Sequence, residues 1–376
     1  MAFIDTRIAG GLFGLLIGLQ SLPALAAQCG GDFGAWAAAF EREAVAKGIS
    51  QRTASALSDL TPDPQVLALD RRQGHFKRSF EEFGLPRIQQ RIGKARTLMQ
   101  QHAALLARIE QQYGVPGAVV IAIWGLETDF GVNQGKQSAL RSLATLAHDC
   151  RRTERFQNEL LDAMRIIDRG DYTPDQLRGA WAGEIGQTQF LPSSFVKFAV
   201  DFDGNGRRDI WNSIPDALAT AANLLRKNGW QSGKTWGYEV DLPAGRKFPS
   251  GSMTLSKWQG IGVTRVSGKG FRNGGDKAEL KAPDGRGGPA FLVTKNFFVL
   301  KAYNNADKYA LAVGLLADEI AGHGGLVRDW NRPFTKLTFA EKQELQERLS
   351  VHGYYDGKFD GKIGRASCRE RVWIPV

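Results

Sequence analysis

The sequence has few of the residues on which metal and nucleophile catalysis usually depend. Its 376 residues include five histidines and three cysteines, and no histidine pair has the H-E-x-x-H spacing of a zinc-binding helix. The G-x-S-x-G turn of serine hydrolases and the P-loop of nucleotide-binding enzymes are absent as well. These absences argue against zinc hydrolases, hydrolases with a nucleophile elbow and P-loop enzymes.

Long apolar runs are also scarce, and the one present lies near the N-terminus. An apolar stretch from Ile8 to Leu22 is followed by Ala24-Leu25-Ala26-Ala27, which has the A-x-A pattern of a signal-peptide cleavage site. The stretch is too short to span a bilayer with margin, and no later segment reaches its length. We therefore interpret residues 1–27 as a signal peptide and expect an exported, periplasmic protein. Gln28 stands where a lipoprotein would have a small residue before Cys29.

Negative charge is in the minority. The 49 Lys and Arg residues outnumber the 39 Asp and Glu residues, so the formal net charge is +10. A basic protein suits an acidic polymer as partner. Because the cations are not concentrated in one block and export is expected, we favour cell-wall polysaccharide over nucleic acid as that partner.

The chain is too long for one comfortable core, and its composition changes along its length. Phe33, Trp36 and Phe40 recur at helical spacing, and similar spacing continues through most of the first two thirds of the chain. Between about residues 231 and 300 the sequence changes to glycine, lysine and alternating apolar residues, which is typical of strands. A helical pattern then resumes. The sequence predicts a mainly α protein with a small β-rich insertion.

One carboxylate stands at the end of an apolar run from Val119 to Leu126. The Glu127 side chain follows Ile123 and Trp124, and burial among such neighbours should raise its pKa toward the range of a general acid. A helix that passes from the core to the surface also commonly ends with a glutamate that simply faces water. From this run alone both interpretations stay open.

A glycine-rich segment extends from Gly179 to Phe195. Its glycines would let the backbone approach a ligand, while the amides of Gln187 and Gln189 and the hydroxyls of Ser193 and Ser194 would bind sugar hydroxyls. A tight turn between helices, with a serine as N-cap, explains the same residues equally well.

The segment from Asp201 to Asn212 has the spacing of an EF-hand calcium loop. Oxygen ligands would come from side chains and from one backbone carbonyl, that of Arg207, so that the ligand set is Asp201, Asp203, Asn205, Arg207, Asp209 and Asn212. Asn212 stands where a bidentate glutamate is usual, so weak affinity is expected. An Asx-rich turn that binds no metal is the alternative.

A fourth segment, Tyr303-Asn304-Asn305, precedes the late helix. Tyr303 and Tyr309 could stack on sugar rings while Asn304 binds hydroxyl or acetamido groups. A helix cap beside a half-buried aromatic pair is the other interpretation.

Taken together, the four segments resemble the membrane-bound lytic transglycosylase B family, glycoside hydrolase family 103. The resemblance covers roughly residues 33 to 325 and rests on the order W-G-x-E-T-x-x-G, W-A-G-x-x-G-x-x-Q-F-x-P-S-S, the calcium-like loop and Y-N-N. It implies a lysozyme-like catalytic domain, which we expect to occupy residues 28–330 including the β-rich insertion. Cys29 and Cys150 could pair in an oxidising compartment and tie the mature N-terminus to this domain.

The resemblance also implies an activity. Family members cleave the β-1,4 bond between N-acetylmuramic acid and N-acetylglucosamine in peptidoglycan, and the 6-hydroxyl of the muramoyl residue, not water, attacks its anomeric carbon to give a 1,6-anhydro product. No cofactor is needed, so calcium would be structural. We expect glycan strands as the binding partner, cell-wall synthesis or division proteins as further candidates, and a monomer. A hydrolytic muramidase and a non-catalytic wall-binding scaffold are the alternatives.

Residue roles follow from the same resemblance. Glu127 matches the sole catalytic acid/base, and the positions that hold the glycan in the family correspond to Gln189, Tyr303, Asn304 and Tyr309. Ser193 and Ser194 match positions that line the site. Glu184 is the best second carboxylate, but some relatives carry a small residue there, so we assign it at most a modulating role. Asp129 would point away from Glu127 if the helix continued through it.

The C-terminal part resembles the front half of a peptidoglycan-binding domain. Residues 331–362 contain a linker and the segment from Leu337 to Lys362, but the helix expected after Gly364 is replaced by an unrelated sequence. Residues 363–372 are what a common sequencing-adapter oligonucleotide encodes in one frame. We therefore expect residues 363–376, which include Cys368, not to belong to the natural chain, and the small helical unit to be truncated.

Overall fold

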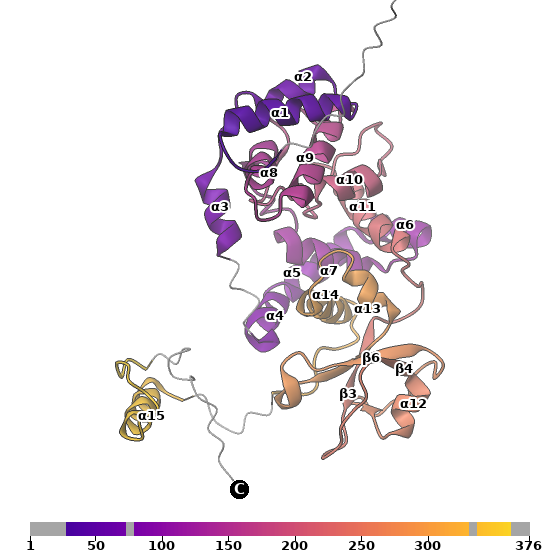
Figure 1. Ribbon diagram of the computed structural model, residues 1–376. Coiled ribbons are helices and arrows are strands. Elements are labelled where there is room, and N and C mark those ends of the chain that lie inside the picture. The colour runs from indigo at the N-terminus through magenta and orange to yellow at the C-terminus, as the bar shows by residue number, and fades with distance from the viewer. Residues whose placement is uncertain (1–27, 73–78, 331–336, 362–376) are drawn as a thin grey trace, which may run out of the picture. The chain divides into compact units, whose positions relative to one another are not determined.

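The computed structural model describes residues 28–72, 79–330 and 337–361 (Figure 1). The chain divides into two compact units. Unit 1 comprises residues 1–77 and 91–232, and unit 2 comprises residues 78–90 and 233–376. The expected signal peptide and the expected foreign tail both lie outside the described residues. Within the described stretches, no helix combines the length and the apolar character that a membrane span requires.

The regular secondary structure of unit 1 is almost all helical. Its elements are α1 (Phe33–Ala46), α2 (Gln51–Ala54), the 3-10 helix η1 (Ser55–Leu57), α3 (Pro64–Arg71), α5 (Ile92–Gln101), α6 (Ala103–Tyr113), α7 (Gly117–Thr128), α8 (Ala139–His148), α9 (Thr153–Asp168), α10 (Pro192–Phe198) and α11 (Ile214–Lys227). Two short strands, β1 (Gln137–Ser138) and β2 (Arg178–Gly179), pair antiparallel.

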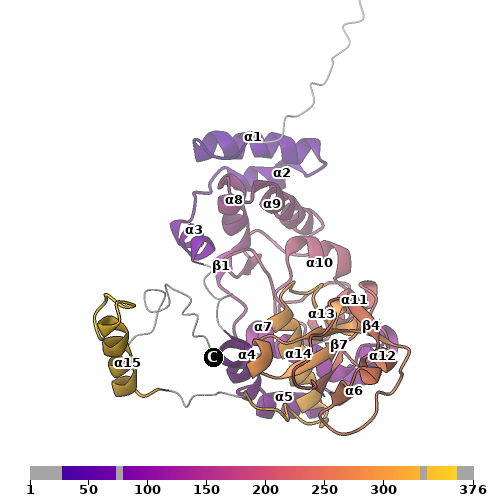
Figure 2. The same cartoon turned by 60° about the horizontal axis from the view of Figure 1, so that its bottom comes forward.

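Helix α1 forms where the helical spacing predicted it. Asp32 caps its N-terminus by accepting a hydrogen bond from the Ala35 N–H, and the Trp36 and Phe40 rings stack at 5.4 Å between centroids. Both rings are buried, because residues four apart lie on the same helical face. In two views α1 and α2 lie across α8 and α9 (Figures 1 and 2).

Helix α7 is buried on all sides through most of its length. Every residue from Gly117 to Gly125 is buried, which explains why the apolar run has no polar face. The helix ends where Asp129 and Phe130 adopt left-handed backbone conformations, with φ values of 54° and 63°. Glu127 therefore stands in the last turn of a helix that the core of unit 1 surrounds.

Unit 2 contains one antiparallel sheet in the strand order β4-β6-β7-β3-β5. Its strands are β3 (Gly237–Asp241), β4 (Ser252–Thr254), β5 (Thr264–Arg265), β6 (Lys277–Lys281) and β7 (Ala290–Val293). The other elements are α4 (Phe80–Gln89), α12 (Leu255–Gly260), the 3-10 helix η3 (Gly285–Gly287), α13 (Lys295–Leu300), α14 (Asp307–Ile320) and α15 (Phe339–Val351).

The central strand β7 is buried on both faces. On one face, Leu292 belongs to a cluster around Trp258, whose indole N–H donates to the Ala278 carbonyl at 2.9 Å. On the other face, the Phe291 ring contacts Trp236, and a Cβ atom added at Gly314 of α14 would meet that indole. The sheet thus packs between the Trp258 cluster and α14.

These elements confirm the predicted class, a mainly α protein with a small β-rich insertion. The predicted insertion at about residues 231–300 corresponds to a sheet whose strands extend from Gly237 to Val293. Its position in the chain could be predicted because alternation and glycine turns are local signals.

Candidate active site

Glu127 is half-buried in the last turn of α7. Ile123 and Trp124, which precede it by about one turn, are 0% and 2% exposed. The next residue, Thr128, is also buried and ends the helix. The carboxylate thus stands where a buried helix gives way to a loop.

Asp129 is poorly placed to act as a second catalytic carboxylate, but the reason differs from the one that the sequence suggested. The helix does not continue through Asp129, so helical geometry does not set its direction. Its carboxylate instead pairs with the Arg91 guanidinium at 2.6 Å, and the Arg91 Nε donates to the Gly125 carbonyl at 2.6 Å. The Asp129 carboxylate is therefore engaged in an ion pair within unit 1.

The glycine-rich segment folds back on itself. Ile185 and Phe190 exchange two backbone hydrogen bonds of 2.8 and 2.9 Å, and the Ala180 N–H donates to the Glu184 carbonyl at 2.9 Å. A Cβ atom at Gly179 would lie 1.9 Å from that same Glu184 oxygen. Only glycine permits this close approach of two backbone segments, so the tight-turn interpretation applies at least to Gly179.

Gln189 lies in the bend of this segment, with a left-handed φ of 50°. Its side-chain amide donates to the carbonyls of Gln134 and Gly186 at 3.1 and 3.0 Å. The residue remains half-exposed. Its amide nitrogen is therefore fixed by the protein, which orients the rest of the amide group.

Two hydrogen bonds join this segment to α7. The Trp124 indole N–H donates to the side-chain oxygen of Gln187 at 3.1 Å, and the Thr128 hydroxyl donates to the Gln187 carbonyl at 2.5 Å. Gln187 is 5% exposed, so its side chain is part of the interior and not of a ligand surface. The sequence suggested sugar binding for this amide, and the structure places it elsewhere.

Ser193 is bound by a carboxylate that the sequence did not single out. Glu159 of α9 is 7% exposed and accepts from the Ser193 backbone N–H at 2.9 Å and from its hydroxyl at 2.8 Å. Burial raises the pKa of Glu159, while these two donors oppose the rise. The hydroxyl of Ser193 thus fixes the start of α10. Ser193 and Ser194 are both half-exposed.

Glu184 is half-buried, and its carboxyl group has a raised pKa. Burial is the main cause, and the nearby negative charge of Glu159 adds to it, whereas Arg155 and backbone donors lower the pKa. A carboxyl group with a raised pKa keeps its proton to higher pH. Glu184 is therefore a weaker candidate for a base that activates water.

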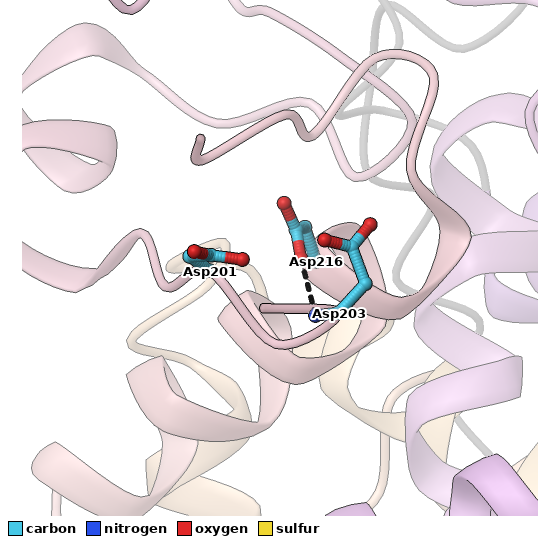
Figure 3. A group of neighbouring side chains, drawn as sticks. All are labelled: Asp201, Asp203 and Asp216. Atoms are coloured by element: carbon cyan, nitrogen blue, oxygen red, sulfur yellow. Dashed lines mark hydrogen bonds between the residues drawn. The ribbon is translucent and has the colours of Figure 1, made fainter. Parts of the chain in front are cut away.

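Three aspartates gather at the acidic loop (Figure 3). Carboxylate oxygens of Asp201, Asp203 and Asp216 lie within 4.8 Å of one another. Asp201 and Asp203 are exposed, whereas Asp216 is fully buried in the first turn of α11. A set of carboxylate oxygens fits a hard cation such as calcium.

Asp216 was missed because it follows the twelve-residue loop. Its carboxylate accepts hydrogen bonds from the backbone N–H groups of Phe202, Asp203 and Asp209 at 2.7, 3.2 and 2.8 Å. Asp216 thus fixes the backbone of the loop. Burial nevertheless raises the pKa of the Asp216 carboxyl group. A calcium ion beside it would offset that effect by favouring the charged form.

The last part of the predicted ligand set has other partners. The Asp209 carboxylate accepts from the Asn212 side-chain amide at 3.0 Å and from the Tyr172 hydroxyl at 3.1 Å. Although burial opposes it, these donors lower the pKa of Asp209. The Asn205 side-chain oxygen accepts the Arg207 N–H at 2.9 Å, as in an Asx turn. The loop combines an Asx-rich turn with an oxygen cluster.

Tyr303, Asn304 and Tyr309 belong to unit 2, whereas Glu127, Gln189 and the acidic loop belong to unit 1. Within unit 2 the two tyrosine rings stack at 6.3 Å between centroids with an interplanar angle of 17°. Both tyrosines are half-buried, and Asn304 is exposed. This is the arrangement that the aromatic-pair interpretation describes, and it leaves an exposed amide beside two rings.

Cys29 and Cys150 form a disulfide bond with a Cα–Cα distance of 5.1 Å. The bond connects the segment before α1 to the turn between α8 and α9. The Gly30 N–H donates to the His148 carbonyl at 2.9 Å, so the same two segments also share a backbone hydrogen bond.

The chain is similar to known proteins over most of its length. A family model described as the transglycosylase SLT domain matches residues 32–318. The membrane-bound lytic murein transglycosylase B of Escherichia coli K12 is 33% identical over 227 residues, which are 59% of this chain and 61% of that protein. The chain thus matches about 61% of the length of that curated relative.

Solved structures extend the similarity to the fold. SltB3 from Pseudomonas aeruginosa, crystallised with NAG-NAM-pentapeptide, is 41% identical, and the match covers 89% of this chain and 92% of that chain with a TM-score of 0.77. The lytic transglycosylase Slt35 of Escherichia coli, in complex with calcium, is 30% identical, with coverages of 79% and 97% and a TM-score of 0.67.

Proposed function

The chain belongs to the transglycosylase SLT domain family, and on that basis we propose that it is a lytic transglycosylase of peptidoglycan. Its substrate is the β-1,4 bond between N-acetylmuramic acid and N-acetylglucosamine, and its products end in 1,6-anhydromuramoyl groups. The observation that carries the proposal is the position of Glu127, the acidic residue of α7, in the last turn of this buried helix and inside the matched region.

In the proposed reaction one carboxyl group serves twice. Glu127 first protonates the glycosidic oxygen as the N-acetylglucosamine leaves. The resulting carboxylate then accepts the proton of the muramoyl 6-hydroxyl as that oxygen bonds to the anomeric carbon. The proton count closes without water, so no second carboxylate is required. A two-carboxylate hydrolase would need one.

The state of the other carboxylates supports this choice over hydrolysis. Asp129 is paired with Arg91, and burial raises the pKa of Glu184, which makes Glu184 a less suitable group for activating water. Glu184 is then a polar neighbour that modulates the site. Hydrolysis remains the alternative that the product analysis below distinguishes.

We further propose a glycan-binding role for Gln189, Tyr303, Asn304 and Tyr309. The amide of Gln189 is oriented by two backbone carbonyls, and the stacked tyrosines with exposed Asn304 offer ring faces and an amide to a sugar. Ser194, half-exposed at the start of α10, is a lining residue, whereas Ser193 acts chiefly through Glu159.

The acidic loop is proposed to bind a structural calcium ion. The support is the cluster of Asp201, Asp203 and Asp216, together with the similarity to Slt35, which has been crystallised with calcium. In this proposal Asp216 supplies the buried negative charge that Asn212 lacks. The chemistry of the reaction itself needs no metal.

Replacing Asp216 by asparagine is expected to lower calcium affinity at least tenfold. One of three negative charges and one hard oxygen ligand are lost, while the side chain keeps its size. Isothermal titration of metal-free protein with calcium chloride measures this. In wild type, calcium at about 100 times its Kd should stabilise unit 1 by about 2.7 kcal/mol.

Asp209→Asn is the comparison for that measurement. Since its carboxylate already serves Tyr172 and Asn212, its replacement should change calcium affinity less than Asp216→Asn does. If Asp209→Asn lowered calcium affinity as much as Asp216→Asn or more, Asp209 would be a ligand, as in an ordinary EF-hand loop. A wild-type protein that binds no calcium would refute the site.

Residues 337–361 are proposed to be part of a peptidoglycan-binding unit. Thr338 and Glu341 form a capping box that starts α15. Gln346 is fully buried, donates to the Tyr355 hydroxyl at 3.2 Å and accepts the Gly361 N–H at 2.8 Å. This buried amide joins the helix to the segment that follows it.

An envelope location agrees with these proposals. A disulfide persists in an oxidising compartment, and peptidoglycan lies outside the cytoplasm. We propose a periplasmic enzyme whose main partner is the glycan strand, and whose positive net charge helps it associate with an anionic envelope. Cell-wall synthesis or division proteins are further candidate partners.

Mass spectrometry of muropeptides released from purified sacculi tests the proposed activity. Wild-type protein should release fragments with anhydromuramoyl ends. Fragments heavier by one water would show hydrolysis and direct attention to Glu184. Binding to sacculi without release would favour the scaffold alternative.

A further inference from the structure

Gln187 lies in the glycine-rich segment, at a position where the sequence pattern of the family allows any residue. Its side chain makes two hydrogen bonds inside unit 1. The side-chain oxygen accepts the Trp124 indole N–H at 3.1 Å, and the side-chain nitrogen donates to the Trp211 carbonyl at 2.9 Å. One amide therefore connects α7 with the segment that ends the acidic loop.

The backbone of Gln187 repeats this connection. Its carbonyl accepts the Thr128 hydroxyl at 2.5 Å, and its N–H donates to the Ile210 carbonyl at 2.9 Å. Two bonds thus reach α7 and two reach residues 210 and 211. All four are in or near the interior, where a lost partner leaves an unsatisfied polar group.

The two α7 partners bracket Glu127. Trp124 stands three residues before it, almost one helical turn away, and Thr128 stands directly after it. The Thr128 hydroxyl also accepts the Gly131 N–H at 2.9 Å, which fixes the turn that follows the helix. A Cβ atom at Gly131 would lie 2.7 Å from the Gln187 side-chain oxygen, so this turn closes directly over the amide.

We propose that Gln187 is a positioning residue for Glu127 and holds the last turn of α7 against the end of the acidic loop. This inference rests on the proposed acid/base role of Glu127. Gln187 does not contact Glu127 through any bond described above; it acts through Trp124 and Thr128. Displacement of a catalytic group by about 1 Å can cost about 100-fold in rate, so loss of this clamp should reduce kcat.

A double-mutant cycle tests the path through Trp124. Gln187→Met keeps the length of the side chain but removes both polar atoms, and Trp124→Phe removes the indole donor. Each single variant should lower kcat about 10- to 100-fold on soluble glycan strands, with KM changed less than about threefold. If the two residues act through one hydrogen bond, the kcat of the double variant should be close to that of the less active single variant.

A spectroscopic readout keeps the test independent of turnover. The indole N–H resonance of Trp124, assigned by its absence in Trp124→Phe, should shift in Gln187→Met because its acceptor is gone. Thr128→Val provides a second variant if Gln187→Met does not fold. It removes the hydroxyl that donates to the Gln187 carbonyl and accepts the Gly131 N–H, and it leaves the Gln187 side chain in place. It should also lower kcat at nearly constant KM.

The control is a variant of equal kind elsewhere in unit 1. Asn223 of α11 donates from its side-chain amide to the Phe198 carbonyl at 2.8 Å, away from the end of α7 in sequence and bonding. Asn223→Leu should lower stability but leave kcat within about twofold. If Gln187→Met and Asn223→Leu lose kcat alike, or if the cycle is additive, Gln187 is merely structural and the inference fails.

Failure of the proposed function has a different signature. In that case wild-type protein releases no anhydromuropeptide, or Glu127→Gln retains activity. Normal wild-type activity and an inactive Glu127→Gln, combined with full kcat in folded Gln187→Met, would overturn the positioning role alone.

Discussion

Glu127→Gln is expected to reduce the release of anhydromuropeptides by about 1000-fold or more while the protein stays folded. Glutamine keeps the size of the side chain but can neither donate a proton to the glycosidic oxygen nor accept one from the 6-hydroxyl. General acid and general base catalysis are each worth about 100- to 10,000-fold, and here one group supplies both. The rate of product release from sacculi, measured by mass spectrometry, gives the ratio.

The effect should be specific to this carboxylate. Glu127 is half-buried at a helix end, so the substitution should change the free energy of unfolding by about 0.5 kcal/mol or less. Glu184→Gln is the matched control and should keep activity within about tenfold, since Glu184 is assigned a modulating role. A Glu184→Gln variant as inactive as Glu127→Gln would point to a second essential carboxylate and hence to hydrolysis.

Features of the candidate site that depend on neighbouring residues could be predicted from the sequence. The apolar run before Glu127 forms one buried helix because no position offers a polar face. Pro215 and the N-cap Ser213 fix the start of α11. Such features are determined by residues that are close together in the sequence, so they can be predicted without knowledge of the fold.

Contacts between distant segments could not be predicted in this way. Asp216 joins Asp201 and Asp203 only because α11 packs beneath the loop, and Ser193 meets Glu159 only because α10 packs on α9. Nothing in the local sequence of Glu159 distinguishes it from a solvated helix glutamate. Partner choice for a buried polar group is decided by tertiary packing, which spacing along the chain does not encode.

The Cys29–Cys150 disulfide also joins distant segments, but the sequence suggested it as a possible pairing, and we expect it to have a large effect on stability. The bond closes a loop with a sequence separation of 121 residues, which contains all the helices from α1 to α8, including α4 of unit 2. The chain-entropy model gives about 5 kcal/mol for a loop of this length. Residual structure in the unfolded chain reduces such gains, so we expect about 4 kcal/mol in practice.

The double variant Cys29→Ser/Cys150→Ser should therefore unfold at a clearly lower denaturant concentration. Replacing both cysteines avoids leaving either one as an unpaired thiol. The opening free energies of amides in α8 and α9, from hydrogen exchange, report on unit 1 and should fall by about 4 kcal/mol, while those in the sheet of unit 2 should change little.

Reduction of the wild-type protein provides the internal check on that prediction. If the stabilisation comes from loop closure, dithiothreitol should lower the same α8 and α9 opening energies by the amount found in the double variant. A loss of opening free energy below about 1 kcal/mol in both experiments would contradict the prediction. It would mean that other contacts, such as the Gly30 to His148 hydrogen bond, already hold the N-terminal segment in place without the disulfide, in the native state or in the unfolded ensemble. The stability of unit 1 would then depend on packing around α8 and α9, and the disulfide would serve chiefly to retain residues 28–32 beside them.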